Sequence, residues 1–211
     1  IGKGFSAIGN KSVVIGFNNG NDSSSPMVAG NESVILGNQS TVWTNKITSG
    51  TMTSIDDIPK GSHIIGNRSM ITESKDSVVV GNDSTITNAD ESIAIGKKAS
   101  VEAANSIAIG SGAKASGEKS ISIGTGNEVK GNKSSAIGDP SYIDTTATGT
   151  HVQGNDNGTA TNPIKASEST FMGNTNLAGT AGTTGIHVVG NINTVDSSNV
   201  MVMGNGVNVG T

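Results

Sequence analysis

The chain has 211 residues, a formal net charge of −4 and an aromatic content of only 2%, so a core built from large aromatic side chains is excluded. It has no cysteine and therefore no disulfide framework. Its charges are scattered without a basic run, which argues against a nucleic-acid partner, and no stretch is long and apolar enough to span a membrane.

A short apolar strand that ends in glycine recurs along the whole chain. After Gly81, the glycines that end such a strand are residues 96, 110, 124 and 138, at a spacing of 15 residues and then of 14. A fixed short period of this kind predicts a solenoid rather than low-complexity disorder. The repeat glycines, in chain order, are Gly9, Gly16, Gly30, Gly37, Gly66, Gly81, Gly96, Gly110, Gly124, Gly138, Gly154, Gly173, Gly190 and Gly204.

A second and weaker strand lies midway between successive glycines. In the copy at 98–102, Ala99 and Val101 alternate with Lys98, Ser100 and Glu102, which predicts a sheet with one solvated face. Each coil thus has two short strands and two tight turns. The predicted fold is an all-β parallel β-roll with about 14 residues per coil.

The glycine-terminated strand differs, because it is apolar at three successive positions, as at 78–80 and 93–95. Successive strand residues face opposite sides, so both faces of this sheet are expected to be buried, and nothing else in the chain is available to cover the outer one. Another copy of the chain is the simplest cover. The isoleucine column before glycine and the valine or alanine column preceding it both remain candidates for the outer face. The residues expected to carry the repeat are Ile95, Gly96, Ile109, Gly110, Ile123, Gly124, Ile137 and Gly138.

The segments 105–110 and 91–96 read Asn-Ser-Ile-Ala-Ile-Gly and Glu-Ser-Ile-Ala-Ile-Gly. This tandem motif resembles the head domain of trimeric autotransporter adhesins, the YadA-like family of Gram-negative surface proteins. The likeness is strongest over 77–138, recognisable over 1–37 and degenerate after Pro140. It implies a left-handed β-roll, a homotrimer and a virulence-related role in adhesion at the bacterial cell surface. It also implies anchoring in the outer membrane through a C-terminal region missing here.

The chain is expected to form a single head domain over 1–211, with irregular insertions near 42–60, 139–150 and 155–167. The first insertion contains Trp43, Ile47 and Ile55, and the second contains Tyr142; these are the only Trp and the only Tyr. One interpretation is that these segments pack onto the roll or form solvated loops. The other is that Trp43, Ile47, Ile55 and Tyr142 contact a ligand, since aromatic residues on loops often do.

The three histidines, His63, His151 and His187, each lie three residues before a repeat glycine and therefore share one column. In a trimer each would form a ring of three imidazoles around the axis if that column faces inward, and such a ring can bind a metal or respond to pH. The alternative is a polar residue tolerated near a strand end. No catalytic motif accompanies them, so the chain is predicted to be neither an enzyme nor dependent on a cofactor or metal.

The leading functional hypothesis is a head that attaches the bacterium to host cells, extracellular matrix or other cells by binding protein or glycan. Its expected partners are two further copies of the chain and a host receptor or matrix protein, with no nucleic acid and with membrane only through the rest of the parent chain. The alternative is a passive structural spacer. A β-helix acyltransferase is disfavoured because its coils have about 18 residues, and an ice-binding solenoid because no flat threonine ranks occur.

Overall fold

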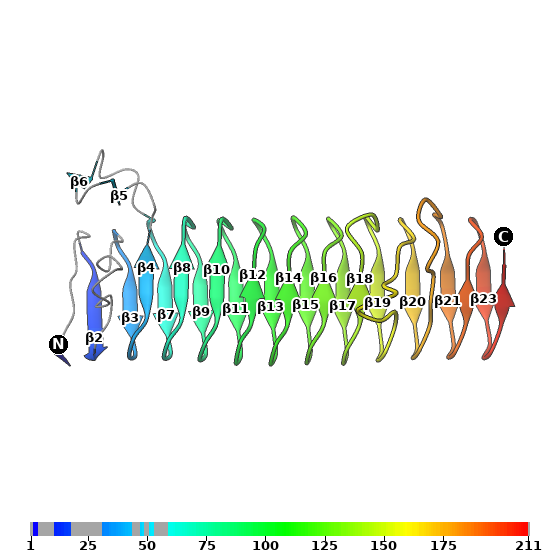
Figure 1. Ribbon diagram of the computed structural model, residues 1–211, viewed down its shortest axis with the longest axis horizontal. Helices are drawn as coiled ribbons and strands as arrows, with labels where there is room; N and C mark the ends of the chain where they lie inside the picture. The colour runs from blue at the N-terminus through cyan, green and yellow to red at the C-terminus, as the bar shows by residue number, and fades with distance from the viewer. Residues whose placement is uncertain are drawn as a thin grey trace. The chain divides into compact units, whose positions relative to one another are not determined.

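The computed structural model describes residues 2–3, 11–17, 31–43, 47–48, 51–52 and 59–210. These residues form strands, turns and bends, and no helix occurs among them. The chain divides into two compact units, Ile1–Asn105 and Ser106–Thr211. In each unit, strands that are far apart in sequence pair in parallel, one coil upon the next, which confirms the predicted parallel solenoid (Figure 1).

The first unit contains two parallel sheets. The glycine-terminated strands form what we call the first sheet, in the order β1 (Gly2–Lys3), β2 (Val13–Phe17), β3 (Val34–Leu36), β7 (His63–Ile65), β9 (Val78–Val80) and β11 (Ile93–Ile95). The midway strands form the second sheet, in the order β4 (Thr41–Trp43), β8 (Met70–Thr72), β10 (Thr85–Thr87) and β12 (Ser100–Val101). A separate antiparallel pair joins β5 (Ile47–Thr48) to β6 (Thr51–Met52).

The second unit repeats this arrangement. Its first sheet runs β13 (Ile107–Ile109), β15 (Ile121–Ile123), β17 (Ser135–Ile137), β19 (His151–Gln153), β20 (Thr170–Met172), β21 (His187–Val189) and β23 (Met201–Met203). Its second sheet runs β14 (Lys114–Ala115), β16 (Glu128–Val129) and β18 (Tyr142–Ile143), and β22 (Thr194–Val195) pairs with β24 (Asn208–Val209). Isolated parallel bridges, such as Ile143 to Ile164, continue the midway ladder between them.

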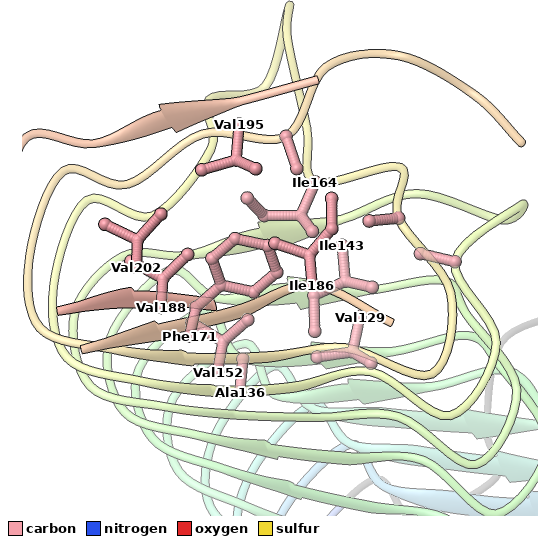
Figure 2. Close-up of a cluster of buried hydrophobic side chains, with 13 residues drawn as sticks. Val129, Ala136, Ile143, Val152, Ile164, Phe171, Ile186, Val188, Val195 and Val202 are labelled. Carbon is pink, nitrogen blue, oxygen red and sulfur yellow. The ribbon is translucent and has the colours of Figure 1, made fainter. Parts of the chain in front are cut away.

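The core lies between the two sheets and is one side chain thick on each side. Every three-residue strand of the first sheet sends only its central residue inward, and Ala94, Ala108 and Ala136 at this position are fully buried. The coils lengthen after Gly138, and the central residue grows from Ala136 through Val152 to Phe171. Figure 2 shows the Phe171 ring among the aliphatic side chains of neighbouring coils. The extra residues in these coils are thus accompanied by a larger core side chain.

Buried polar side chains satisfy the backbone at the corners between the sheets. Ser84 Oγ donates to the carbonyl oxygen of Gly96 at 2.6 Å and accepts the amide of Ala99 at 3.1 Å. In the second unit asparagine does the same, since Asn176 Nδ2 donates to the Gly190 carbonyl at 2.9 Å and its Oδ1 accepts the Asn193 amide at 3.1 Å. These side chains are polar yet buried because a turning backbone has unpaired groups that must be hydrogen-bonded.

The repeat glycine is required by both conformation and space. Gly124 has φ of +125°, and a Cβ there would overlap the carbonyl oxygen of Gly138 in the next coil. Gly110 stands in the same relation to Gly124, with φ of +132°. The period seen in the sequence is therefore a column of backbones packed too closely for any side chain.

Candidate functional site

The outer side of the first sheet presents two columns of apolar side chains, one on each side of the buried central residue. Ile65 is 51% exposed, Ile137 46% and Val189 47%. The two candidate columns are thereby distinguished, because the valine or alanine column faces the core and the isoleucine column before glycine faces outward. The structural repeat residues Ile95, Ile109, Ile123 and Ile137 all lie on this outer side, each beside its glycine.

We call this surface the uncharged face, because none of its residues is acidic or a lysine or arginine. In the first unit it comprises Val13, Ile15, Val34, Leu36, His63, Ile65, Val78, Val80, Ile93 and Ile95. In the second unit it comprises Ile107, Ile109, Ile121, Ile123, Ser135, Ile137, His151, Gln153, Thr170, Met172, His187, Val189, Met201 and Met203. In the first unit this surface is apolar apart from His63, and an exposed apolar surface of this kind marks an interaction site rather than an ordinary solvated surface.

The outer side of the second sheet has the opposite character. Lys114 and Lys130 approach the Glu128 carboxylate at 3.9 Å and 3.2 Å, and all three side chains are partly solvated. In the first unit, Arg68 and Asp83 lie in turns that connect the two sheets. The Arg68 guanidinium donates two hydrogen bonds to the Asp83 carboxylate, at 2.6 Å and 2.8 Å. That hydrogen bond lowers the pKa of Asp83 and raises the pKa of Arg68. In the second unit the outer side of the second sheet thus carries a solvated, charged surface.

Tyr142 lies on this charged side. It belongs to β18, pairs in register with Glu128 of β16 and is half-buried, while the next residue, Ile143, fills the core. The turn that follows is closed by Asp144, whose Oδ1 accepts hydrogen bonds from the Thr146 amide and hydroxyl at 3.0 Å and 2.9 Å. Burial alone raises the pKa of Asp144, but these hydrogen bonds outweigh it and the pKa is lowered.

The other three predicted ligand contacts belong to the first unit. The backbone of Trp43 continues β4 opposite Thr72, and the preceding Val42 is fully buried in the core. The backbone of Ile47 pairs with Met52 in the β5–β6 hairpin. Ile55 lies outside the described residues. Trp43 and Ile47 thus belong to a different unit from Tyr142.

The segments expected as insertions contain coil residues as well as excursions. Val42 and Tyr142 lie on paired strands, as described above. Within 155–167, Asn157 is fully buried in the corner ladder and Ile164 is fully buried in the core, which a purely solvated loop would not give. The exposed parts are residues 155–156 and the turn 159–162, which is closed by hydrogen bonds between Thr159 and Asn162. Sequence composition did not show that these positions are buried, because composition does not distinguish an asparagine buried by hydrogen bonds from one in a loop.

Each histidine occupies the first outward position of its strand, His63 in the first unit and His151 and His187 in the second. His63 pairs in register with Val34 and Val78, His151 with Ser135 and Thr170, and His187 with Thr170 and Met201. His151 Nδ1 lies 2.9 Å from Ser135 Oγ, whereas His63 Nδ1 is buried without a hydrogen-bond partner. Within one copy, and among the described residues, no group of three or more His, Cys, Asp or Glu side chains is placed to hold a metal ion.

The described part of the chain contains no helix with the length and hydropathy needed to cross a bilayer.

Comparison with known families identifies the repeat. Two copies of the YadA head domain repeat match the chain, at residues 88–113 and 115–139. These ranges cover the most regular coils, from the turn before β11 to the strand β17. No curated protein matches the chain. The resemblance to a YadA-like head is therefore confirmed, and it points to an adhesin type of function.

Proposed function

We propose that this chain, which carries the YadA head repeat of trimeric autotransporter adhesins, is a homotrimeric adhesin head. It attaches a Gram-negative bacterium to host cells, extracellular matrix or other cells. The observation that carries the proposal is the tandem match of this repeat at residues 88–139 on a parallel β-solenoid. The head is exposed at the cell surface and is held in the outer membrane by another region of the parent protein.

The uncharged face supports the assembly. An outward surface that is apolar along successive coils and has no acidic residue, lysine or arginine is costly to leave in water and has nothing to repel an identical surface. Further copies of the same chain therefore suit it better than a charged partner does. In a closed trimer each copy presents this face to the other two, while the second sheet stays in solvent.

Ligand binding is then a property of the second sheet and the corners. Tyr142 is the aromatic residue on the charged side of the second unit, and Trp43 ends a second-sheet strand of the first unit. Aromatic residues are favoured interface anchors, and three copies of each contact turn modest affinity into strong avidity. The head acts by binding and has no enzymatic role.

The direct test is binding of the purified trimer to immobilised collagen, fibronectin and laminin and to whole host cells. The adhesin proposal predicts saturable binding to at least one of these. A folded trimer that binds neither matrix proteins, host cells nor other bacterial cells contradicts it and favours the passive spacer.

The location of the site is tested with Trp43→Ala and Tyr142→Ala, each compared with Thr85→Ala, an outward second-sheet substitution without an aromatic ring. At least one aromatic variant should weaken binding tenfold or more, with the trimer and melting temperature unchanged. Unchanged binding by both variants would move the site to the repeat surface of the regular coils.

A further inference from the structure

Among the described residues of the uncharged face, the histidines are the only titratable side chains. Histidine is the side chain that ordinarily gains a charge between pH 8 and pH 5. On a surface otherwise made of isoleucine, valine, leucine, methionine and uncharged polar residues, protonation of these three side chains is the only way for charge to appear.

His63 has apolar neighbours on both sides. Val34 and Leu36 on β3, and Val78 and Val80 on β9, are the outward residues of the adjacent strands. Its Nδ1 is already buried without a partner. Charged residues occur at the preceding corners, where Glu32, Lys60, Lys75 and Asp76 are of mixed sign. None of them lies on the face itself.

The two histidines of the second unit have polar but uncharged neighbours. His151 lies between Ser135 and Thr170, and His187 between Thr170 and Met201. The other outward residues on the same and adjacent strands, Ile137, Gln153, Met172, Val189 and Met203, carry no charge. At the preceding corners, Lys133 and Glu168 are exposed, and the Glu168 carboxylate lies against Gly149 rather than on the face.

Covering this face changes the cost of protonation. An imidazolium enclosed between apolar surfaces loses its hydration and finds no carboxylate on its own face or on an identical face opposite. Threefold symmetry makes the cost larger, because each protonated histidine has two equivalent like charges at the same level of the assembly. In a separated chain the side chains of His151 and His187 are exposed to water, while His63 is partly buried.

We propose that the uncharged face is an acid-sensitive assembly surface, in which His63, His151 and His187 release the copies of the chain from one another when they are protonated. This inference rests on the proposed trimer and deepens it. The sign follows from linkage, because the separated chains bind more protons than the assembly and a fall in pH therefore favours dissociation. Association therefore weakens as the pH falls.

The test measures the association constant by sedimentation equilibrium at pH 7.5, 6.0 and 5.0, with circular dichroism at each pH to establish that the coils remain folded. The wild type should be trimeric at pH 7.5, and its dissociation constant should rise at least a hundredfold by pH 5.0. The triple variant His63→Gln, His151→Gln and His187→Gln should change less than threefold, and Gln153 shows that glutamine already occupies this face.

A second variant gives the charged state at neutral pH. His151→Lys with His187→Lys should dissociate at pH 7.5, whereas Thr194→Lys, on the solvated second-sheet strand β22, should remain assembled. A wild type without a trimer at pH 7.5 contradicts the proposed assembly. A trimer that persists unchanged at pH 5.0, or a glutamine variant as acid-sensitive as the wild type, overturns the histidine inference alone.

Discussion

At the residue scale, the repeat is explained by two positions at which only one type of side chain fits. The glycines that follow the first-sheet strands, such as Gly110 and Gly124, lie so close to the carbonyl of the glycine in the next coil that a Cβ would overlap it. The serine or asparagine at the following corner is buried because it bonds backbone groups of two coils. Both positions could be identified from the sequence as periodic, but their period alone does not give the reason.

The glycine position is tested by Gly124→Ala. The added Cβ would overlap the Gly138 backbone, so a loss of about 3 kcal/mol in unfolding free energy is expected from overpacking and the unfavourable φ. Gly206→Ala is the matched control, because Gly206 also has positive φ (+68°) but no atom lies within 4 Å of its Cβ position. That variant should lose only about 1 kcal/mol. Equal losses in thermal or urea unfolding would contradict the close-packed column.

The corner position is tested by Ser84→Ala. The change leaves the Gly96 carbonyl and the Ala99 amide without their side-chain partner in a buried corner. The expected loss is about 2 kcal/mol, typical of a buried group left unpaired. Urea unfolding measures it, with Ser100→Ala on the solvated side of β12 as control, and a Ser84 variant as stable as that control would refute the ladder's role.

At the element scale, the sequence predicted the coil but not the orientation of its first strand. A strand with three apolar residues in a row, as in Ile107–Ile109, fits both orientations, because it has no polar residue that would identify the solvent side. The structure selects the central residue as the inward one. The size of that residue was the available signal, since Ala94 and Ala108 suit a core between two close sheets better than the isoleucines beside them.

This orientation separates the effects of two adjacent substitutions. Ala108→Asp places a carboxylate in the fully buried column and should prevent stable folding of its coil, at a cost of several kcal/mol. Ile109→Asp places the same group on the uncharged face, so the chain should fold and fail to assemble. Circular dichroism and sedimentation distinguish the two results, and a well-folded Ala108→Asp chain beside an unfolded Ile109→Asp chain would reverse the assigned orientation.

The midway strands and the irregular segments show where composition is informative and where it misleads. The alternation at 98–102 correctly predicted that Ala99 and Val101 are buried, because a strand with one solvated face has polar residues at every second position. In the polar run 155–167 the same logic failed at Asn157, which is buried by its hydrogen bonds rather than by hydrophobicity. The predicted contacts Trp43 and Tyr142 could be placed on paired strands, but their role in binding remains a prediction.

At the scale of the whole molecule, the central claim is that the uncharged face is covered by other copies of the chain. The fold of a single copy leaves Ile65, Ile137 and Val189 about half exposed on this face, and no other described element packs over them. Adhesion, avidity and the acid response all depend on that assembly. Its failure would leave the solenoid intact and remove the basis for each of them.

Sedimentation equilibrium of the purified chain at neutral pH and micromolar concentration tests this claim most directly. A trimer predicts a mass three times the 21.0 kDa of one chain, without dissociation on tenfold dilution. The variant Ile109→Asp, run in parallel, should give the mass of one chain. A wild-type protein that sediments as a stable, folded monomer would contradict the account.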